Sequence, residues 1–331
     1  MMPASHDQSP SLAVNGGPGR AGAFGRWLGM ASLLAGLVLT VPPVTVPAPA
    51  MAAASRVSSQ VERVARGQYL FDAAGCFGCH TDEVHGGQRL AGGRALDTPF
   101  GTFYPPNITP DPIYGIGNWS NAAFIRALRH GVRADGSSLF PAFPYTSYTL
   151  MDDGDILDLK AYLMTQKPVA QPNRPHELKD PFGWRVLMPA WNLMYLEVGP
   201  LDTNPHQSAQ WNRGQYLVRA LGHCGECHTR RDWAGGLDQR QMLAGNPGGN
   251  GGAGAPNLTP EVETGLGKWS EADLLLLLEI GLKPDGDVVG GSMAEVVRNT
   301  TSMLTLADRK AMVAYLRSLP PMVFPHVEPH R

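Results

Sequence analysis

Two five-residue stretches decide the fold class: CFGCH, from Cys76 to His80, and CGECH, from Cys224 to His228. Together they contain all four cysteines of the 331-residue chain. Cys-x-x-Cys-His is the attachment signature of c-type haem, in which both thiols bond to the haem vinyl groups and the histidine binds the iron. A redox dithiol does not require the histidine, and a zinc site would join both halves. The sequence therefore predicts two covalently bound haem c groups, with thioether bonds and iron ligands from Cys76, Cys79, His80, Cys224, Cys227 and His228.

Longer matches surround these motifs and reveal an internal repeat. RGQYLFDAAGCFGCHT (66–81) returns as RGQYLVRALGHCGECHT (213–229), with one extra residue. The remaining matches follow in the same order in both stretches. They pair PNITPD with PNLTPE, GIGNWS with GLGKWS, ALRHGVRADG with LLEIGLKPDG, and DILDLKAYL with DRKAMVAYL. We interpret the two stretches as a first and a second copy of one domain.

Each copy is predicted to consist mainly of helices. The first helix leads into the haem motif, with Val61, Val64, Ala65 and Tyr69 at helical spacing. A middle helix begins at a serine N-cap, Ser120 or Ser270, and a last helix covers 153–164 or 306–319. We expect an all-α fold of two tandem class I cytochrome c-like domains, each wrapped on a covalent haem and joined by an ordered strap. The predicted boundaries are a signal peptide and cleavage region at 1–54, the first domain at 55–167, the strap at 168–210, the second domain at 211–324 and a tail at 325–331.

The predicted strap begins with the proline-rich stretch KPVAQPNRP and continues with PFGWRVLMPAWNLMYLEVG (181–199). A free linker would not contain so many large apolar residues. We expect this segment to pack across both domains, although the sequence leaves a partly disordered spacer as the alternative.

The N-terminus has the pattern of an export signal. Arg20 and Arg26 precede the apolar run WLGMASLLAGLVLTV (27–41), and small residues follow at 48–55. The run is short for a membrane-spanning helix, although an uncleaved anchor is an alternative. Export to the periplasm agrees with covalent haem attachment. The net charge of −2 gives no indication of a nucleic-acid partner.

The second copy offers a candidate for the distal iron ligand. A methionine thioether is a common ligand opposite histidine, and it raises the reduction potential. The stretch GGSMAEVV (290–297) places Met293 in an expected glycine-rich loop after the middle helix. We predict that Met293 binds the iron of the second haem.

The first copy lacks this methionine. When Gly136 is aligned with Gly286, Met293 falls opposite Phe143, in SLFPAFPYTSYT (138–149). A phenyl ring cannot donate to iron, so three possibilities stay open. A nearby Met151 substitutes, although its alignment with Leu304 favours a core position; another side chain reaches over; or the site is open and capped by Phe143. Candidates for the second possibility are Met188, Met194 and His130.

Two further pairs occupy equivalent positions in the copies. Trp119 and Trp269 are interpreted either as donors to a haem propionate or as packing residues. Asn107 and Asn257, each after a proline, are interpreted as turn formers.

Several stretches together resemble a known family. They are RGQYL…GCFGCHT, PNITPDPIYGIGNWS, RHGVRADGSSLFPAFPYTSYT, WNRGQYLVRALGHCGECHT and GGSMAEVVRNTT…LTLADRKAMVAYLRSLPP. The chain is similar to the multihaem cytochrome c subunits of periplasm-facing dehydrogenases. The resemblance implies a catalytic partner subunit that is a quinoprotein, a flavoprotein or a molybdenum enzyme, and a downstream acceptor such as a quinone, a cytochrome or an oxidase. Membrane association would then arise through partners. Many members have PAMP where this chain has PAFP.

The main functional prediction is an electron-transfer subunit without a catalytic site of its own. The alternative is an enzyme, a dihaem peroxidase in which the first haem is open to hydrogen peroxide. Such an enzyme needs an acid–base group over the iron, for which His130 is the nearby candidate.

Overall fold

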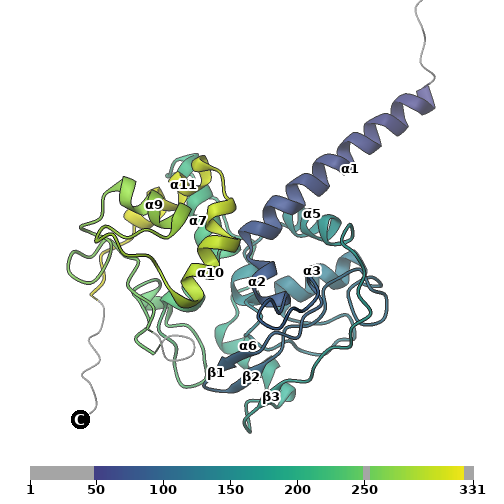
Figure 1. Ribbon diagram of the computed structural model, residues 1–331, viewed down its shortest axis with the longest axis horizontal. Helices are drawn as coiled ribbons and strands as arrows, with labels where there is room; N and C mark the ends of the chain where they lie inside the picture. The colour runs from purple at the N-terminus through teal and green to yellow at the C-terminus, as the bar shows by residue number, and fades with distance from the viewer. Residues whose placement is uncertain (1–47, 249–253, 324–331) are drawn as a thin grey trace, which may run out of the picture. The chain divides into compact units, whose positions relative to one another are not determined.

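The computed structural model describes residues 48–248 and 254–323 (Figure 1). The longer helices are α1 (Ala48–Ala73), α3 (Asn121–His130), α5 (Asp153–Leu163), α6 (Met188–Tyr195), α7 (Ala209–Tyr216), α9 (Glu271–Ile280), α10 (Gly291–Asn299) and α11 (Leu306–Arg317). Short helices are α2 (Cys76–His80), α4 (Tyr145–Tyr148) and α8 (Gly225–His228), with 3₁₀ turns η1 (Arg185–Leu187), η3 (Gln239–Gln241) and η4 (Thr301–Met303) and a π-helical turn η2 (Leu217–Leu221).

The fold is mostly helical, as predicted, but it is not purely α. Strands β1 (Leu96–Thr98), β2 (Gly101–Phe103) and β3 (Glu177–Leu178) form an antiparallel sheet in the order β1-β2-β3. Strands of two or three residues are too short to produce an alternating pattern in a sequence, so the predicted all-α fold does not include them. Strands β1 and β2 belong to the loop that follows the Cys-x-x-Cys-His motif of the first copy. Strand β3, which pairs with β2, belongs to the segment predicted as a strap.

The first and last helices of each copy pack against each other. Figure 1 shows α1 beside α5 and α7 beside α11. At the crossing points lie Gly67 and Gly214, which occupy equivalent positions in the two RGQYL stretches. A Cβ at Gly67 would collide with the backbone oxygen of Asp158, and one at Gly214 with that of Ala311. Glycine therefore allows the two backbones to approach closely in both copies.

The buried face of α1 differs from the predicted one. Val64 and Tyr69 pack against the core, but Val61 is 63 % exposed and Ala65 is exposed as well. The buried positions lie nearer the motif, at Gly67, Leu70, Phe71, Ala73 and Ala74. The reason is that α5 covers α1 from about Gly67 towards the motif. Hydrophobic periodicity shows which face of a helix is apolar, but it does not show where along the helix the contact begins.

The middle and last helices begin and end close to the predicted positions. Ser120 accepts from the Ala123 amide at the start of α3, and Ser270 forms a complete capping box with Asp273 at the start of α9. Helix α5 ends one residue before the predicted end, and α11 ends two residues before it.

Loop hydrogen bonds recur at equivalent positions of the two copies. The Leu90 amide donates to the Thr81 hydroxyl at 3.0 Å, and the Leu243 amide donates to the Thr229 hydroxyl at 2.9 Å. Both leucines have a positive φ, 60° and 65°. The sequence repeat is thus accompanied by the same local backbone geometry, in which a leucine further along the chain binds the threonine that follows each histidine.

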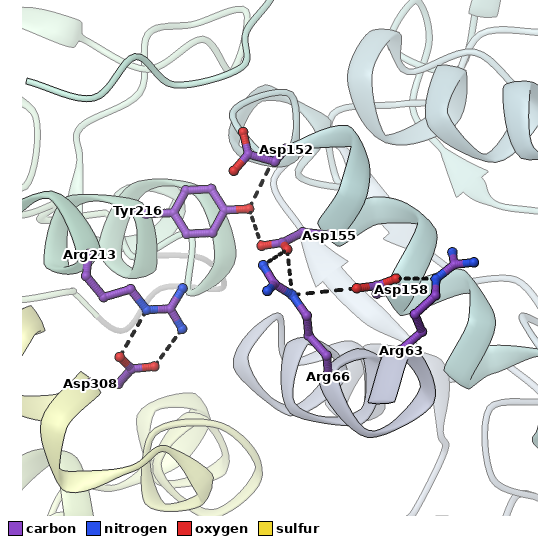
Figure 2. A network of polar contacts seen from close by, with 8 residues as sticks. All are labelled: Arg63, Arg66, Asp152, Asp155, Asp158, Arg213, Tyr216 and Asp308. Carbon is purple, nitrogen blue, oxygen red and sulfur yellow. Dashed lines mark hydrogen bonds and ion pairs between the residues drawn. The ribbon is translucent and has the colours of Figure 1, made fainter. Parts of the chain in front are cut away.

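The two copies contact each other through a polar network (Figure 2). The Tyr216 hydroxyl, from α7, donates to Asp155 at 2.9 Å and accepts from the Asp152 amide at 3.2 Å. Asp155 also forms an ion pair with Arg66 of α1. The Asp155 carboxylate therefore joins α5 and α1 of the first copy to α7, the first helix of the second copy.

Residues of the predicted strap contact both copies. The indole of Trp191, on α6, donates to the Ala234 carbonyl at 3.0 Å, while Tyr145 donates to Asn192 at 2.7 Å. The apolar side of α6 completes a small cluster with side chains of the first copy. The buried members of that cluster are Phe103, Phe140, Tyr145, Met188 and Trp191.

The predicted signal falls mainly on residues 1–47, and the tail on 324–331, both outside the described residues. Across 48–248 and 254–323, no helix combines the length and the apolar character needed to cross a bilayer.

Candidate haem-attachment sites

Each Cys-x-x-Cys-His motif forms one short helical turn. Cys76, Cys79 and His80 lie on α2, so residues three and four apart share a face of the turn. In the second motif Cys224 caps α8, which contains Cys227 and His228. None of the four cysteines, all of which lie in the described part of the chain, forms a disulfide. Local helix geometry thus brings the three motif side chains of each copy together.

The histidines of the two motifs are held by matching hydrogen bonds. Nδ1 of His80 lies 2.7 Å from the Pro106 carbonyl, and Nδ1 of His228 lies 2.7 Å from the Pro256 carbonyl. A carbonyl only accepts, so Nδ1 carries the proton and Nε2 keeps the lone pair. Burial lowers the pKa of both imidazoles and outweighs the hydrogen bond to the carbonyl, which raises it. The lowered pKa favours the neutral imidazole, which is the form that binds metals. The donor set therefore fits an iron bound through Nε2 in each copy.

Sequence reasoning missed the two proline carbonyls that orient these rings. The PNIT and PNLT stretches were interpreted only as turns, although they recur after both histidines. Asn107 and Asn257 do form turns, since each accepts from a threonine amide two residues later, at 2.9 and 2.8 Å. Both are also buried, and they donate to carbonyls of more distant segments.

The thiols do not have the properties of a redox pair. Burial raises the pKa of Cys76 and of Cys224 to about 12. Redox-active cysteines instead have a lowered pKa, because the thiolate is the reactive form. Across 48–248 and 254–323, no group of three or more His, Cys, Asp or Glu side chains is arranged to hold a metal ion.

Each motif is also anchored by the other copy. Glu226, inside the second motif, accepts from Thr146 and Ser147 of α4, both at 2.8 Å. At the equivalent place in the first motif, the Gly78 carbonyl accepts from Arg94, which forms an ion pair with Glu295 of α10 at 2.8 Å. Helix α4 of the first copy therefore contacts the motif of the second copy, and α10 of the second copy contacts the motif of the first through Arg94.

Met293 does not lie in a loop. It occupies the first turn of α10 and is partly exposed. Gly290 is the N-cap of this helix and Gly291 its first residue, so the loop ends before Met293, earlier than the sequence predicts. Ligation by Met293 stays a prediction.

Phe143 is partly buried and packs against both hydrophobic clusters. Its ring lies 5.4 Å from that of Tyr148. Among the other candidates, Met151 is fully buried in the main core, as expected for a packing residue. Met194 is 65 % exposed and His130 is exposed, whereas Met188 is buried in the cluster that Phe143 also contacts.

Trp119 and Trp269 both pack partly buried against the main core, which agrees with the packing interpretation. Their backbone carbonyls each accept from a basic side chain of the last helix, although the two donors are not at equivalent positions. Trp119 accepts from Lys160 of α5, and Trp269 accepts from Arg317 of α11.

Comparison with known proteins agrees with this geometry. Residues 64–167 match the family model of cytochrome c. A diheme cytochrome c-type protein of Cereibacter sphaeroides is 44 % identical over 263 residues, which cover 77 % of this chain and 85 % of that protein. The chain belongs to the cytochrome c family. This cytochrome also resembles subunits of larger enzymes.

The fructose dehydrogenase cytochrome subunit of Gluconobacter japonicus is 42 % identical over 87 % of this cytochrome, which spans 57 % of that subunit. The cytochrome c subunit of the quinone-dependent alcohol dehydrogenase of Gluconacetobacter polyoxogenes is 41 % identical over 78 % of this chain, and 56 % of that subunit is covered. The predicted resemblance to dehydrogenase cytochrome subunits is therefore confirmed. The cytochrome spans just over half the length of each of these two subunits.

Proposed function

We propose that this cytochrome is an electron-transfer subunit with two covalently bound haem c groups, one in each copy. It accepts single electrons from a catalytic dehydrogenase subunit and passes them to a respiratory acceptor. The observation that carries this proposal is the matching 2.7 Å hydrogen bond that Nδ1 of His80 and of His228 each donates to a proline carbonyl. A carrier needs its iron ligands fixed in both oxidation states, and this bond fixes the ring and its tautomer.

The chain's residues would act as follows. Cys76 and Cys79 would hold the first haem and Cys224 and Cys227 the second, with His80 and His228 as proximal ligands. Each bound haem supplies one-electron chemistry, and the protein tunes its potential through the axial ligands and burial. Met293 is proposed as the distal ligand of the second haem. The two copies are proposed as tandem cytochrome domains, with 168–210 as the strap between them.

Location and partners belong to the same proposal. The basic and apolar N-terminal pattern supports export to the periplasm, and the names of the relatives support a dehydrogenase partner. A quinoprotein, a flavoprotein or a molybdenum enzyme would each fit. The peroxidase alternative lacks support from the geometry, because its candidate acid–base group, His130, is exposed at the end of α3.

The test begins with the intact mass of the protein expressed in a host that attaches haem c. The mass should include two porphyrins, and the double variants Cys76→Ser/Cys79→Ser and Cys224→Ser/Cys227→Ser should each carry one. The neighbouring genes are searched for a catalytic dehydrogenase subunit. A subunit found there is mixed with the cytochrome, and haem reduction on addition of that enzyme's substrate is followed by absorbance. A protein without porphyrin, or one that turns over peroxide instead of accepting electrons from the dehydrogenase, would overturn the proposal.

A further inference from the structure

In the first copy, the predicted strap binds the end of the middle helix and the hairpin that follows it. Arg185 donates to the Ser138 carbonyl at 2.6 Å, and its guanidinium lies 4.3 Å from the ring centre of Phe140. Asn192 donates to the His130 carbonyl at 3.4 Å. Both donors belong to one short segment that runs from η1 to α6, so the two carbonyls face the same surface of the first copy.

The second copy builds the same hairpin after its own middle helix. An antiparallel bridge joins Val132 to Ser138 in the first copy and Leu282 to Val288 in the second. The alignment therefore makes Val288 the counterpart of one residue whose carbonyl the strap binds. Ile280, at the end of α9, is the counterpart of the other. The second copy thus repeats the backbone to which the strap binds in the first.

The outward face of α9 is apolar, whereas that of α3 is polar. Leu276 and Ile280 lie one turn apart, and they are 40 % and 59 % exposed. The alignment places them opposite Arg126 and His130, which are exposed as well. Val288 adds a third large apolar side chain that is 59 % exposed. Helices that are apolar all round are normally buried, so these three residues, which we name the α9 surface, have the character of an interface.

The rim of the α9 surface has an excess of negative charge. Lys283 forms ion pairs with Asp287 at 2.7 Å and with Asp285 at 3.6 Å. One cation therefore opposes two carboxylates. In the first copy, the corresponding pair of Arg133 with Asp135 is balanced, because a serine stands opposite Asp287. A positively charged side chain from a partner would restore this balance in the second copy.

We propose that the α9 surface docks a segment of the catalytic dehydrogenase subunit that contains large apolar side chains and an arginine. This inference rests on the proposed function, which supplies that subunit as the partner. The first copy is the template, because there Arg185 and apolar residues of the strap cover the equivalent hairpin. The apolar side chains of the docked segment pack on Leu276 and Ile280. Its arginine donates to the Val288 carbonyl and pairs with Asp287.

The excess negative charge argues against other occupants of this surface. Two α9 surfaces that face each other in a symmetric dimer would bring like charges together. An anionic lipid surface would be repelled for the same reason. The strap of a second copy is already engaged, because its Arg185 is bound to Ser138 of its own first copy. A basic and apolar segment of the catalytic subunit meets none of these objections.

The first test uses the full-length protein in its native host, with the photo-crosslinker p-benzoylphenylalanine in place of Ile280. The control carries the crosslinker in place of Leu193, which is 90 % exposed on α6. Mass spectrometry should identify a catalytic dehydrogenase subunit, joined through an arginine-containing apolar segment, at the first position and not at the second. A crosslink from the first position to a second copy or to lipid, or no crosslink there, would overturn the docking surface.

The second test measures the affinity of the crosslinked subunit for purified, haem-loaded variants. Leu276→Arg/Ile280→His introduces the residues of the first copy, and it should weaken binding by roughly tenfold or more. Asp287→Ser should weaken binding less, with a difference that shrinks at high salt. Leu193→Arg is the matched control and should bind like wild type, and the intact mass of every variant should include both porphyrins.

The outcomes separate the docking surface from the proposed function. Wild-type affinity in the double variant, or equal weakening in Leu193→Arg, would overturn the docking surface alone. A wild-type protein that binds the catalytic subunit but accepts no electrons from it would instead contradict the proposed function.

Discussion

The Tyr69 hydroxyl donates a 2.7 Å hydrogen bond to Asp308, from the first helix of the first copy to the last helix of the second. Asp308 also pairs with Arg213 at 2.6 Å (Figure 2). The bond from Tyr216 to Asp155 is its counterpart, because the two tyrosines and the two aspartates occupy equivalent positions of the repeat. Each copy therefore places the tyrosine of its RGQYL stretch on the ion pair of the other copy.

This reciprocity predicts a pH dependence of stability. Burial raises the pKa of Asp308, but hydrogen bonds from Arg213 and Tyr69 outweigh it, so the folded-state pKa lies below its usual value. A depressed carboxyl pKa adds stability at pH values above the unfolded-state pKa of about 3.9, and this stability is lost as the pH falls through the folded-state pKa. Asp308→Asn should therefore cost about 2 kcal/mol of unfolding free energy at pH 7, with the difference shrinking below about pH 4.

The measurement for Asp308 is urea unfolding of the haem-loaded protein at a series of pH values. Asp202→Asn serves as the matched control, because Asp202 is exposed. A difference between wild type and Asp308→Asn that stays constant from pH 7 to below pH 4 would contradict the role of its carboxylate.

The close helix crossing at Gly67 predicts that the stability of the fold depends strongly on the size of the side chain at this position. A methyl group there collides with the backbone of α5, and relieving this clash should cost roughly 1–3 kcal/mol in Gly67→Ala. Gly154→Ala is the control within α5, because a Cβ at Gly154 would meet no atom within 4 Å. Thermal unfolding should show a clear loss for the first variant and almost none for the second. Equal stability of both variants would show that the helices separate freely.

Met293 is predicted to set the potential of one haem. Met293→Ala should lower one of the two midpoint potentials by roughly 100 mV or more, because axial ligands move haem potentials over a range of about 0.8 V. Met303→Ala is the matched control, since Met303 lies on η4 and is 54 % exposed. Spectroelectrochemical titration separates the two potentials. Unchanged potentials in Met293→Ala would reject this residue as a ligand.

Phe143 predicts two unlike haems. The EPR spectrum of the oxidised wild type should contain one His/Met signal and one different signal. Phe143→Met places a thioether where the repeat expects one, and it should raise the potential of the first haem towards that of the second. Phe140→Met is a nearby control, because Phe140 is buried in the cluster of Phe103 and Trp191. Two identical His/Met signals in wild type would contradict the predicted difference.

The contacts between the copies could not be predicted from the sequence. The alignment identified Tyr69 with Tyr216 and Asp155 with Asp308, but not that each tyrosine binds the aspartate of the other copy. Repeat matching compares equivalent positions, whereas a reciprocal contact joins positions that are not equivalent. The extra residue before Cys224 is visible in the sequence, yet the contact of its ring with Tyr148 depends on how the π-helical turn directs His223.

The sequence alone predicts the covalent attachment of haem, because Cys-x-x-Cys-His acts within one helical turn and needs no distant partner. It also determined the helix starts at Ser120 and Ser270, since capping is local. Three features became visible only in the folded chain: the buried face of α1, the small sheet, and the carbonyls that orient His80 and His228. These features depend on segments far apart in the chain, whose approach is set by packing, and local pattern does not encode it.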